Sequence, residues 1–279
     1  MPINDILRAG RTAVITGGAS GIGLASAKAY AERGMQVCIA DRNEEDLASA
    51  LEALTEIADN DHIARNVDVS DFAAVAAFKD EAVDGRDIAV VMNNAGTSRP
   101  NSSVGELEAW QKLIATNLWG VIHGVQAFGP HLIEVNHPAM IINTGSKQGI
   151  TNPPGNPAYN VTKAGVRSLT ESLAHELRTT EGCQVTAHLL VPGFTYTGLI
   201  SRFIPEKPPA AWTSDEVVEY MLEKLDAGAF YILCPDNDVS EAMDQKRIQW
   251  NTDDLIEGRS ALSRWDPAYE SEFNTFMDS

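Results

Sequence analysis

The sequence predicts an α/β fold in which helices cover both faces of a doubly wound parallel sheet, giving three layers and about seven strands. Short apolar runs alternate along the chain with stretches whose apolar residues recur at helical spacing. Within each run the apolar residues are consecutive, which is typical of strands buried on both faces. We find no internal repeat and no low-complexity linker, so residues 1–279 are expected to form a single domain.

The apolar runs place the strands, in chain order, at residues 12–16, 36–40, 62–67, 88–93, 139–145, 184–191 and 230–234. The first helix is expected over 21–34, with Gly34 as its C-terminal stop. A second helix is predicted over 44–57 because four apolar residues recur there at helical spacing: Leu47, Leu51, Leu54 and Ile57.

Two segments interrupt this alternation. Residues 196–229 carry a proline-rich turn and a helix, and we expect an insertion over the sheet edge that forms a substrate lid. A static surface loop is the alternative. Residues 240–279 are polar with scattered aromatic side chains. They are expected to form a docked extension that contributes to a subunit contact, or else a loosely ordered tail.

The charge balance restricts the possible partners. Asp and Glu number 39 against 21 Lys and Arg, a formal net charge of −18. Such a surface disfavours nucleic acid and anionic membranes, and no apolar run is long enough to span a bilayer. No secretory signal is visible, and a cytoplasmic location is expected. The three cysteines, Cys38, Cys183 and Cys234, are read as buried thiols, and no spacing indicates a metal site.

A glycine-rich turn, GGASGIG (17–23), follows the first strand and opens the first helix. Glycine permits the backbone conformations and close approach that a Cβ would prevent. The free N–H groups at the start of a helix suit a pyrophosphate. We therefore expect this turn to bind a dinucleotide through Gly17, Ser20, Gly21, Ile22 and Gly23.

The ends of the second and third strands carry carboxylates. Asp41 can accept hydrogen bonds from an adenosine ribose and would repel a 2′-phosphate, which favours NAD over NADP. Arg42 is also expected to contact the cofactor. Its guanidinium could bind a 2′-phosphate, which would favour NADP instead. Asp68, followed by Val69, is placed to contact adenine; capping a helix that begins near Ser70 is the alternative.

Tyr159 and Lys163 are four residues apart in a helical pattern, so both side chains share one helix face. A free phenol ionises near pH ~10, and a neighbouring ammonium in a partly dry cleft would lower its pKa. Ser146 ends the fifth strand, where its hydroxyl can hold a substrate oxygen or cap a turn. Asn117 sits within a helix, where its amide either ties a water to Lys163 or makes one internal hydrogen bond that kinks the helix.

With these motifs in order, the sequence resembles the single-domain short-chain dehydrogenases/reductases, a branch of roughly 250 residues. The resemblance covers about residues 8–200, and the last eighty residues share only a final strand. The matching motifs are TGGASGIG (16–23), Asp41, Asp68, NNAG (93–96), Asn117, Ser146, YNVTK (159–163) and PGFTYT (192–197).

The resemblance implies a Rossmann-like sheet with the cofactor across the carboxyl ends of its strands. It implies that Tyr159 is the general acid/base, that Lys163 lowers its pKa and binds the nicotinamide ribose, that Ser146 polarises the carbonyl and that Asn117 completes a proton relay. The NNAG motif would support the central strand and line the adenosine side, with Asn93 as the contact and Asn94, Ala95 and Gly96 beside it. Pro192 and Gly193 would pack on the nicotinamide, with Thr195 and Thr197 holding its carboxamide.

The function expected is NAD-dependent interconversion of a secondary alcohol and a ketone by hydride transfer. The substrate is expected to be moderately hydrophobic. Its pocket would use Ser146 and Tyr159 together with Gln148, Ile150, Phe194, Tyr196 and Leu199. Relatives pair the helices that hold Asn117 and Tyr159, so a homodimer or homotetramer is expected. The alternatives are an NAD-binding sensor or scaffold without turnover, and a sugar-nucleotide-modifying relative.

Overall fold

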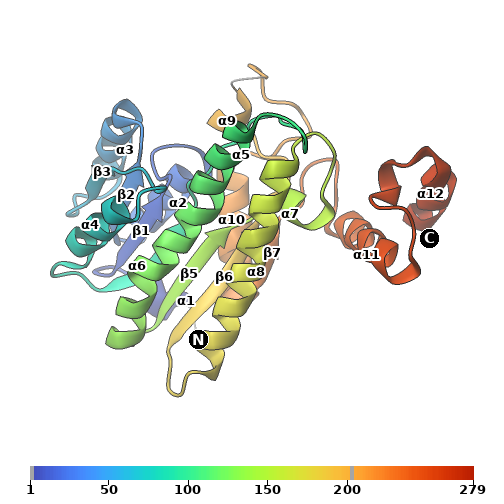
Figure 1. The fold of residues 1–279 in the computed structure, drawn as a ribbon. Coiled ribbons are helices and arrows are strands. Elements are labelled where there is room, and N and C mark those ends of the chain that lie inside the picture. Colours follow the sequence, from blue (N-terminus) through green and yellow to red (C-terminus); the bar gives the residue numbers. More distant parts are fainter. Residues whose placement is uncertain (1–2, 202–203) are drawn as a thin grey trace.

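The computed structural model describes residues 3–201 and 204–279, and within these ranges only the side chain of Leu199 is left undescribed. Seven strands form one parallel sheet in the order β3-β2-β1-β4-β5-β6-β7 (Figure 1). The strands are β1 (Thr12–Thr16), β2 (Gln36–Asp41), β3 (Ile63–Asn66), β4 (Ile88–Asn93), β5 (Ala139–Thr144), β6 (Val185–Val191) and β7 (Tyr231–Leu233). The fold class predicted from the sequence is therefore confirmed.

Every predicted strand is present, and its ends differ from the prediction by one residue at most. The first helix is shorter than predicted, because α2 (Gly21–Ala31) ends three residues before Gly34. Gly34 has φ of +74°, and its N–H donates to the Ala31 carbonyl at 2.8 Å, so it closes a turn that follows the helix. Glycine takes this left-handed conformation just after a helix ends. Gly34 therefore marks the end of the turn that follows α2 and not the last residue of the helix.

One face of the sheet is covered by α2, α3 (Glu44–Ile57) and α10 (Ser214–Asp226). The side chains of α10 that enter this core include Val217 and Met221, both fully buried. The helix α10 packs against α2. The second half of segment 196–229, which was expected to be an insertion, therefore belongs to this helix layer. The first half contains the short α9 (Gly198–Ser201) and the exposed turn around 204–209.

The opposite face is covered by α4 (Phe72–Val83), α6 (Gly120–Val135) and α8 (Pro157–Thr179), which cross in front of the strands in Figure 1. A small helix, α5 (Leu107–Leu113), and a π-helical turn, η1 (Ile114–Trp119), lead into α6. At the start of the chain, α1 (Ile3–Ile6) lies by the amino-terminal ends of the strands. No helix in the described part of the chain is both long and apolar enough to cross a bilayer.

A chain of buried polar groups joins the sheet to this second helix layer. Asn93 Nδ2 donates to Asn143 Oδ1 at 2.8 Å, and Asn143 Nδ2 donates to Thr170 Oγ1 at 3.0 Å. The contact needs a glycine on α6, because a Cβ on Gly124 would lie 1.8 Å from Asn93 Oδ1. Gly124 thus lets α6 approach β4 closely enough for the amides to pair.

After β7 the chain leaves the sheet as a helical extension made of α11 (Glu241–Glu257), η2 (Ser263–Trp265), η3 (Pro267–Tyr269) and α12 (Glu270–Asp278). It projects sideways from the body (Figure 1). Trp250 is its centre: it is 2% exposed, its indole N–H donates to Ser263 Oγ, and the rings of Phe273 and Phe276 pack on it. Arg259 stacks on the same indole at 3.9 Å from the ring centroid.

We expect Gly124→Ala to lower the free energy of unfolding by about 1–3 kcal/mol, since the added methyl must displace α6 or break the Asn93–Asn143 pair. Urea unfolding followed by circular dichroism measures the change. Gly129→Ala on the same helix is the matched control, because a Cβ there meets nothing within 4 Å. That control should be neutral or stabilising, and equal losses in the two variants would contradict the assignment.

Candidate active site

Tyr159 and Lys163 stand on α8 near the carboxyl ends of β4 and β5. Lys163 is 4% exposed, and its ammonium donates to the Thr144 carbonyl at 2.8 Å. Its Nζ lies 5.7 Å from the centroid of the half-buried Tyr159 ring. The two side chains that were predicted to share one helix face therefore lie close together over the sheet edge.

Ser146 follows β5 directly, so the strand end aims its hydroxyl at Tyr159. The hydroxyl accepts the Gln148 N–H at 3.2 Å and is hydrogen-bonded to the Tyr159 phenol. Ser146 thus makes the turn contact raised as one alternative, and its place beside the phenol leaves the other, a contact with a substrate oxygen, open. A hydroxyl fixed in this way can share a ligand oxygen with the phenol.

The protonation of the pair differs from the sequence argument, which expected the ammonium to lower the tyrosine pKa. Burial raises the pKa of Tyr159 above its ordinary value, and the hydrogen bond with Ser146 is the contact that opposes this rise. Burial also lowers the pKa of Lys163 to about 8. Desolvation disfavours the charged form of both groups, so it dominates over their mutual attraction.

Asn117 is fully buried in the π-helical turn η1. Its amide makes two opposed bonds to one residue: Oδ1 accepts the Thr97 N–H and Nδ2 donates to the Thr97 carbonyl, each at 2.8 Å. A Cβ on Gly96 would lie 3.6 Å from Asn117 Oδ1 and 3.7 Å from Lys163 Nζ. Asn117 and Lys163 therefore converge on one small space, and π-helical turns of this kind are frequent at functional sites.

The glycine turn is folded too tightly for side chains. A Cβ on Gly23 would lie 2.0 Å from the Gly17 carbonyl oxygen, and one on Gly17 would lie 2.7 Å from Ala95 Cα. Gly17 and Gly21 have φ of +66° and +54°. Ser20, the N-cap of α2, makes no side-chain capping bond, so the first N–H groups of the helix, including that of Ile22, are left for another acceptor. This arrangement suits a pyrophosphate.

The motif after β4 supports the turn. Asn94 Nδ2 donates to the Gly17 carbonyl at 3.1 Å, and the N–H groups of Asn94 and Ala95 both donate to Thr16 Oγ1. Asn93, expected to be the contact on the adenosine side, instead points into the core toward Asn143. Successive strand residues face opposite sides, so the neighbouring Asn94 is the residue that meets the glycine turn.

Asp41 ends β2 beside the same turn. One carboxylate oxygen accepts the Ala19 N–H at 3.3 Å, and the other accepts the Arg42 N–H at 2.7 Å. The side chain of Arg42 is exposed. A half-buried carboxylate thus stands at the edge of the turn, with a guanidinium next to it in the chain.

Asp68 accepts hydrogen bonds from the N–H and the hydroxyl of Ser70, which lower the pKa of its carboxyl. It closes a turn, while Asp71 is the N-cap of α4, so the helix begins two residues later than Ser70. Val69 is buried, and its carbonyl bonds to the ring of His123.

The segment after β6 returns to the glycine turn. A Cβ on Gly21 would lie 3.3 Å from Thr197 Cγ2, which brings Thr197 against the start of α2. Thr195 is buried, and its hydroxyl donates to the Gly193 carbonyl at 3.3 Å. Pro192 accepts the Lys147 N–H at 3.3 Å. Residues 192–197 therefore bridge the Ser146 loop and the glycine turn.

The expected substrate residues lie on two segments. Gln148 and Ile150 belong to α7 (Gln148–Thr151), directly after Ser146. The backbones of Phe194 and Tyr196 pair with Trp212, and the Tyr196 hydroxyl donates to the Pro205 carbonyl at 2.5 Å. The side chain of Leu199 lies outside the described part of the structure.

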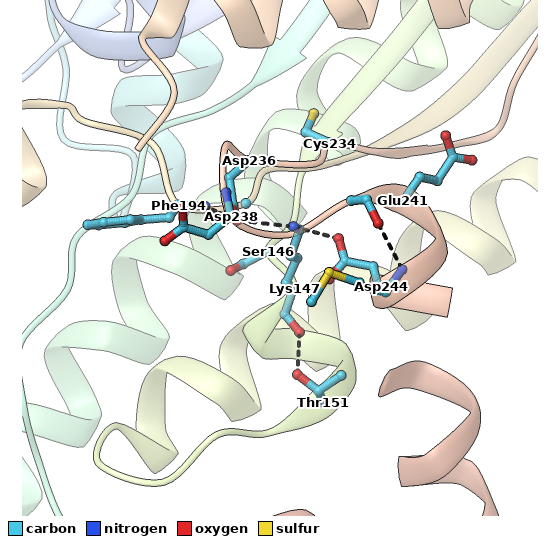
Figure 2. Close-up of polar contacts among 12 residues, drawn as sticks. Ser146, Lys147, Thr151, Phe194, Cys234, Asp236, Asp238, Glu241 and Asp244 are labelled. Carbon is cyan, nitrogen blue, oxygen red and sulfur yellow. Dashed lines mark hydrogen bonds and ion pairs between the residues drawn. The ribbon is translucent and has the colours of Figure 1, made fainter. Parts of the chain in front are cut away.

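Sequence reasoning missed three residues beside this site: Lys147, Asp236 and Asp244. They form a buried cluster directly behind Ser146 (Figure 2). Lys147 is adjacent to Ser146 in the chain, but its acidic partners follow β7, and no local pattern connects them to it.

A Rossmann-like sheet with a glycine turn and a Ser–Tyr–Lys set at its carboxyl edge defines a class of nucleotide-binding oxidoreductases. Residues 11–207 match the family model described as short chain dehydrogenase, and the chain belongs to that family.

Similar proteins act on hydroxylated compounds. The 2,5-dichloro-2,5-cyclohexadiene-1,4-diol dehydrogenase LinX of Sphingobium indicum is 36% identical over 203 residues, covering 71% of this chain and 78% of the relative. The 3beta-hydroxysteroid dehydrogenase 2 of Eggerthella lenta is 34% identical over 199 residues, covering 70% and 75%. A short-chain dehydrogenase/reductase of Burkholderia phymatum, solved in complex with NAD, superposes with a TM-score of 0.81 at 30% identity, covering 90% and 96%.

The lowered pKa of Lys163 predicts a pH-dependent cost of burial. The unfolded state holds the lysine proton more tightly (pKa ~10.4), so the cost is full below the folded pKa of about 8 and fades as pH rises above it. The free energy of unfolding of the wild type minus that of Lys163→Met should therefore increase by about 2 kcal/mol between about pH 7 and about pH 9.5.

Urea unfolding at a series of pH values measures this difference. Lys112→Met, at an exposed lysine on α5, is the control and should give a difference that stays flat. A flat difference for Lys163→Met as well would show that this ammonium is solvated in the folded protein.

Proposed function

We propose that this protein interconverts a secondary alcohol and a ketone by hydride transfer, with NAD as cofactor and Tyr159 as general acid/base. The observation that carries the proposal is the nearly buried Lys163 ammonium 5.7 Å from the Tyr159 ring, with Ser146 placed so that it opposes the rise in the pKa of that phenol. A core would not bury an ammonium next to a phenol and a serine without a use for their protons.

NAD, when bound, would accept the hydride when the alcohol is oxidised, and its reduced form would supply the hydride when the ketone is reduced. Ser146 would hold the substrate oxygen beside the phenol and stabilise it as its charge changes. Because burial raises the pKa of Tyr159, the phenol is protonated near neutral pH and can donate to a carbonyl oxygen. In the opposite direction the phenolate removes the hydroxyl proton, and the Ser146 hydroxyl stabilises that phenolate by donating to it.

The residues around the glycine turn support the cofactor assignment. The turn has no room for a Cβ at Gly17 or Gly23, and the start of α2 offers free N–H groups. The Asp41 carboxylate stands beside it and would repel a 2′-phosphate. Asp68, Asn94, Gly96 and Thr197 are the further residues we propose to line the dinucleotide.

The substrate class follows from the lining. Ile150 and Phe194 are apolar, with Gln148 and Tyr196 as polar groups, so a moderately hydrophobic alcohol or ketone fits. The two dehydrogenases reported above act on a cyclohexadiene diol and on a hydroxysteroid, which agrees with this class.

We further propose that the chain works as a homodimer or homotetramer in the cytoplasm. Large apolar side chains are exposed on α4, η1, α6 and α8: Phe72, Trp119, Ile133 and Val161. Exposed side chains of this kind on neighbouring helices would suit a surface that another subunit covers.

Tyr159→Phe should lower turnover by about 100-fold to 10,000-fold, because it removes the proton that general acid/base catalysis transfers. Binding of NAD, measured by fluorescence titration, should stay unchanged. Tyr231→Phe is the control: Tyr231 lies on the edge strand β7, its hydroxyl donates to Glu171 Oε1 on α8 at 2.7 Å, and turnover should match the wild type. Substantial turnover by Tyr159→Phe would refute the acid/base assignment.

Asp41→Asn should raise kcat/KM with NADP relative to that with NAD by about tenfold, since the amide keeps the shape of the carboxylate and removes the charge that repels a 2′-phosphate. Steady-state kinetics with both cofactors measure the ratio. Asp46→Asn, in the first turn of α3, is the control and should leave the ratio unchanged. An unchanged ratio for Asp41→Asn would show that Asp41 does not select the cofactor.

A further inference from the structure

Lys147 directly follows Ser146, and its side chain ends between two carboxylates (Figure 2). Its Nζ lies 3.3 Å from Asp236 Oδ2 and 2.5 Å from Asp244 Oδ2. The side chains of the two aspartates are only 7% and 6% exposed, and that of Lys147 is 17% exposed. One cation thus pairs with two nearly buried carboxylates, and its loss would leave both negative charges without this partner.

The backbone of Lys147 fixes the position of Ser146. Lys147 is the N-cap of α7, and its carbonyl accepts the N–H groups of Ile150 and Thr151 at 3.0 and 3.1 Å. Its own N–H donates to the Pro192 carbonyl at 3.3 Å. A shift of Lys147 would therefore move both the Ser146 hydroxyl and the start of α7.

Asp236 ties the same cluster to the segment after β6. Asp236 Oδ2 accepts the Phe194 N–H at 3.3 Å. A Cβ on Gly193 would lie 2.8 Å from Lys147 Nζ and 3.0 Å from Asp236 Oδ2. Gly193 was expected to pack against the nicotinamide. A side chain at this position would collide with the Lys147–Asp236 pair. The turn at 193–194 is held by this pair.

Asp244 comes from the first turn of α11 and brings the C-terminal extension into the cluster. Burial raises the pKa of its carboxyl, and Lys147 opposes the rise. Two turns further along α11, Asn251 Nδ2 donates to the Ile150 carbonyl at 3.3 Å. The extension therefore contacts α7 at two points, and only the contact through Asp244 is an ion pair.

We propose that Lys147 is a positioning residue through which the C-terminal extension fixes the Ser146 hydroxyl and the turn at 193–194. The inference rests on the proposed function, because its effect is on the alcohol–ketone reaction. Asp236 fixes Lys147 from the sheet side and Asp244 fixes it from the extension. Reacting groups must be held closely, since a displacement of about 1 Å can cost about 100-fold in rate.

Four variants test this inference: Lys147→Met, Lys147→Arg, Asp244→Asn and, as the matched control, Asp238→Asn. Asp238 is an exposed carboxylate in the same turn as Asp236, and its side chain does not take part in the cluster. The measurements are kcat and KM for a hydrophobic secondary alcohol, the Kd for NAD by fluorescence titration, and the melting temperature.

Lys147→Met should lower kcat by about 100-fold, and Asp244→Asn by about tenfold, while the Kd for NAD stays within about twofold. Lys147→Arg keeps the charge and should recover most of the turnover. Asp238→Asn should equal the wild type. This pattern separates positioning from general stability, because the latter would weaken NAD binding and lower the melting temperature in parallel with kcat.

Wild-type kcat in Lys147→Met, or in Asp244→Asn, would overturn the inference while leaving the proposed function intact. Parallel loss of turnover, NAD affinity and melting temperature in both variants would overturn it too, since that outcome indicates a collapsed cleft. Absence of turnover in the wild type across a panel of secondary alcohols and ketones would overturn the proposed function and this inference with it.

Discussion

Withdrawal of the Lys163 ammonium from water is the constraint on which the rest of the site depends. A charge with 4% exposure needs a fixed partner, and the Thr144 carbonyl at the end of β5 provides it. This contact sets the height of α8 over the sheet edge, and hence the position of the Tyr159 ring. The backbone of α7 also comes very close to that of α8 at this residue, since a Cβ on Gly149 would lie 2.4 Å from the Lys163 carbonyl carbon.

The same desolvation sets the protonation of the two side chains. Burial makes the phenol of Tyr159 a weaker acid and the ammonium of Lys163 a stronger one, so the phenol keeps its proton while the ammonium gives up its own more readily. Asn117 and Gly96 leave a small space beside Lys163, and Ser146 lies near enough to the phenol to lower its pKa against the effect of burial. Residues of one chain therefore surround the tyrosine with both donors and acceptors.

The sequence allowed the sheet and the proximity of Tyr159 and Lys163 to be predicted because both depend on short-range patterns: apolar runs for the strands, and four-residue spacing for the two side chains. Two failures have the same origin. Asn93 and Asn94 are adjacent, and only the pleat decides which one meets the glycine turn. Spacing shows that an ammonium is near a phenol, but the sign of the pKa shift depends on burial. Lys147 and Asp236 are 89 positions apart, and no pattern along the chain reports such a contact.

The helical extension around Trp250 has a consequence for how this chain can change. Its aromatic cluster and the Asp254–Ser263 hydrogen bonds join residues close in sequence, and the matched family region ends at residue 207, before the extension begins. Folding of the sheet and folding of the extension are therefore largely separate problems. Mutations could remodel the surface of the extension over evolutionary time without disturbing the strands, while the Lys147–Asp244 and Lys224–Glu241 ion pairs keep the extension attached to the body.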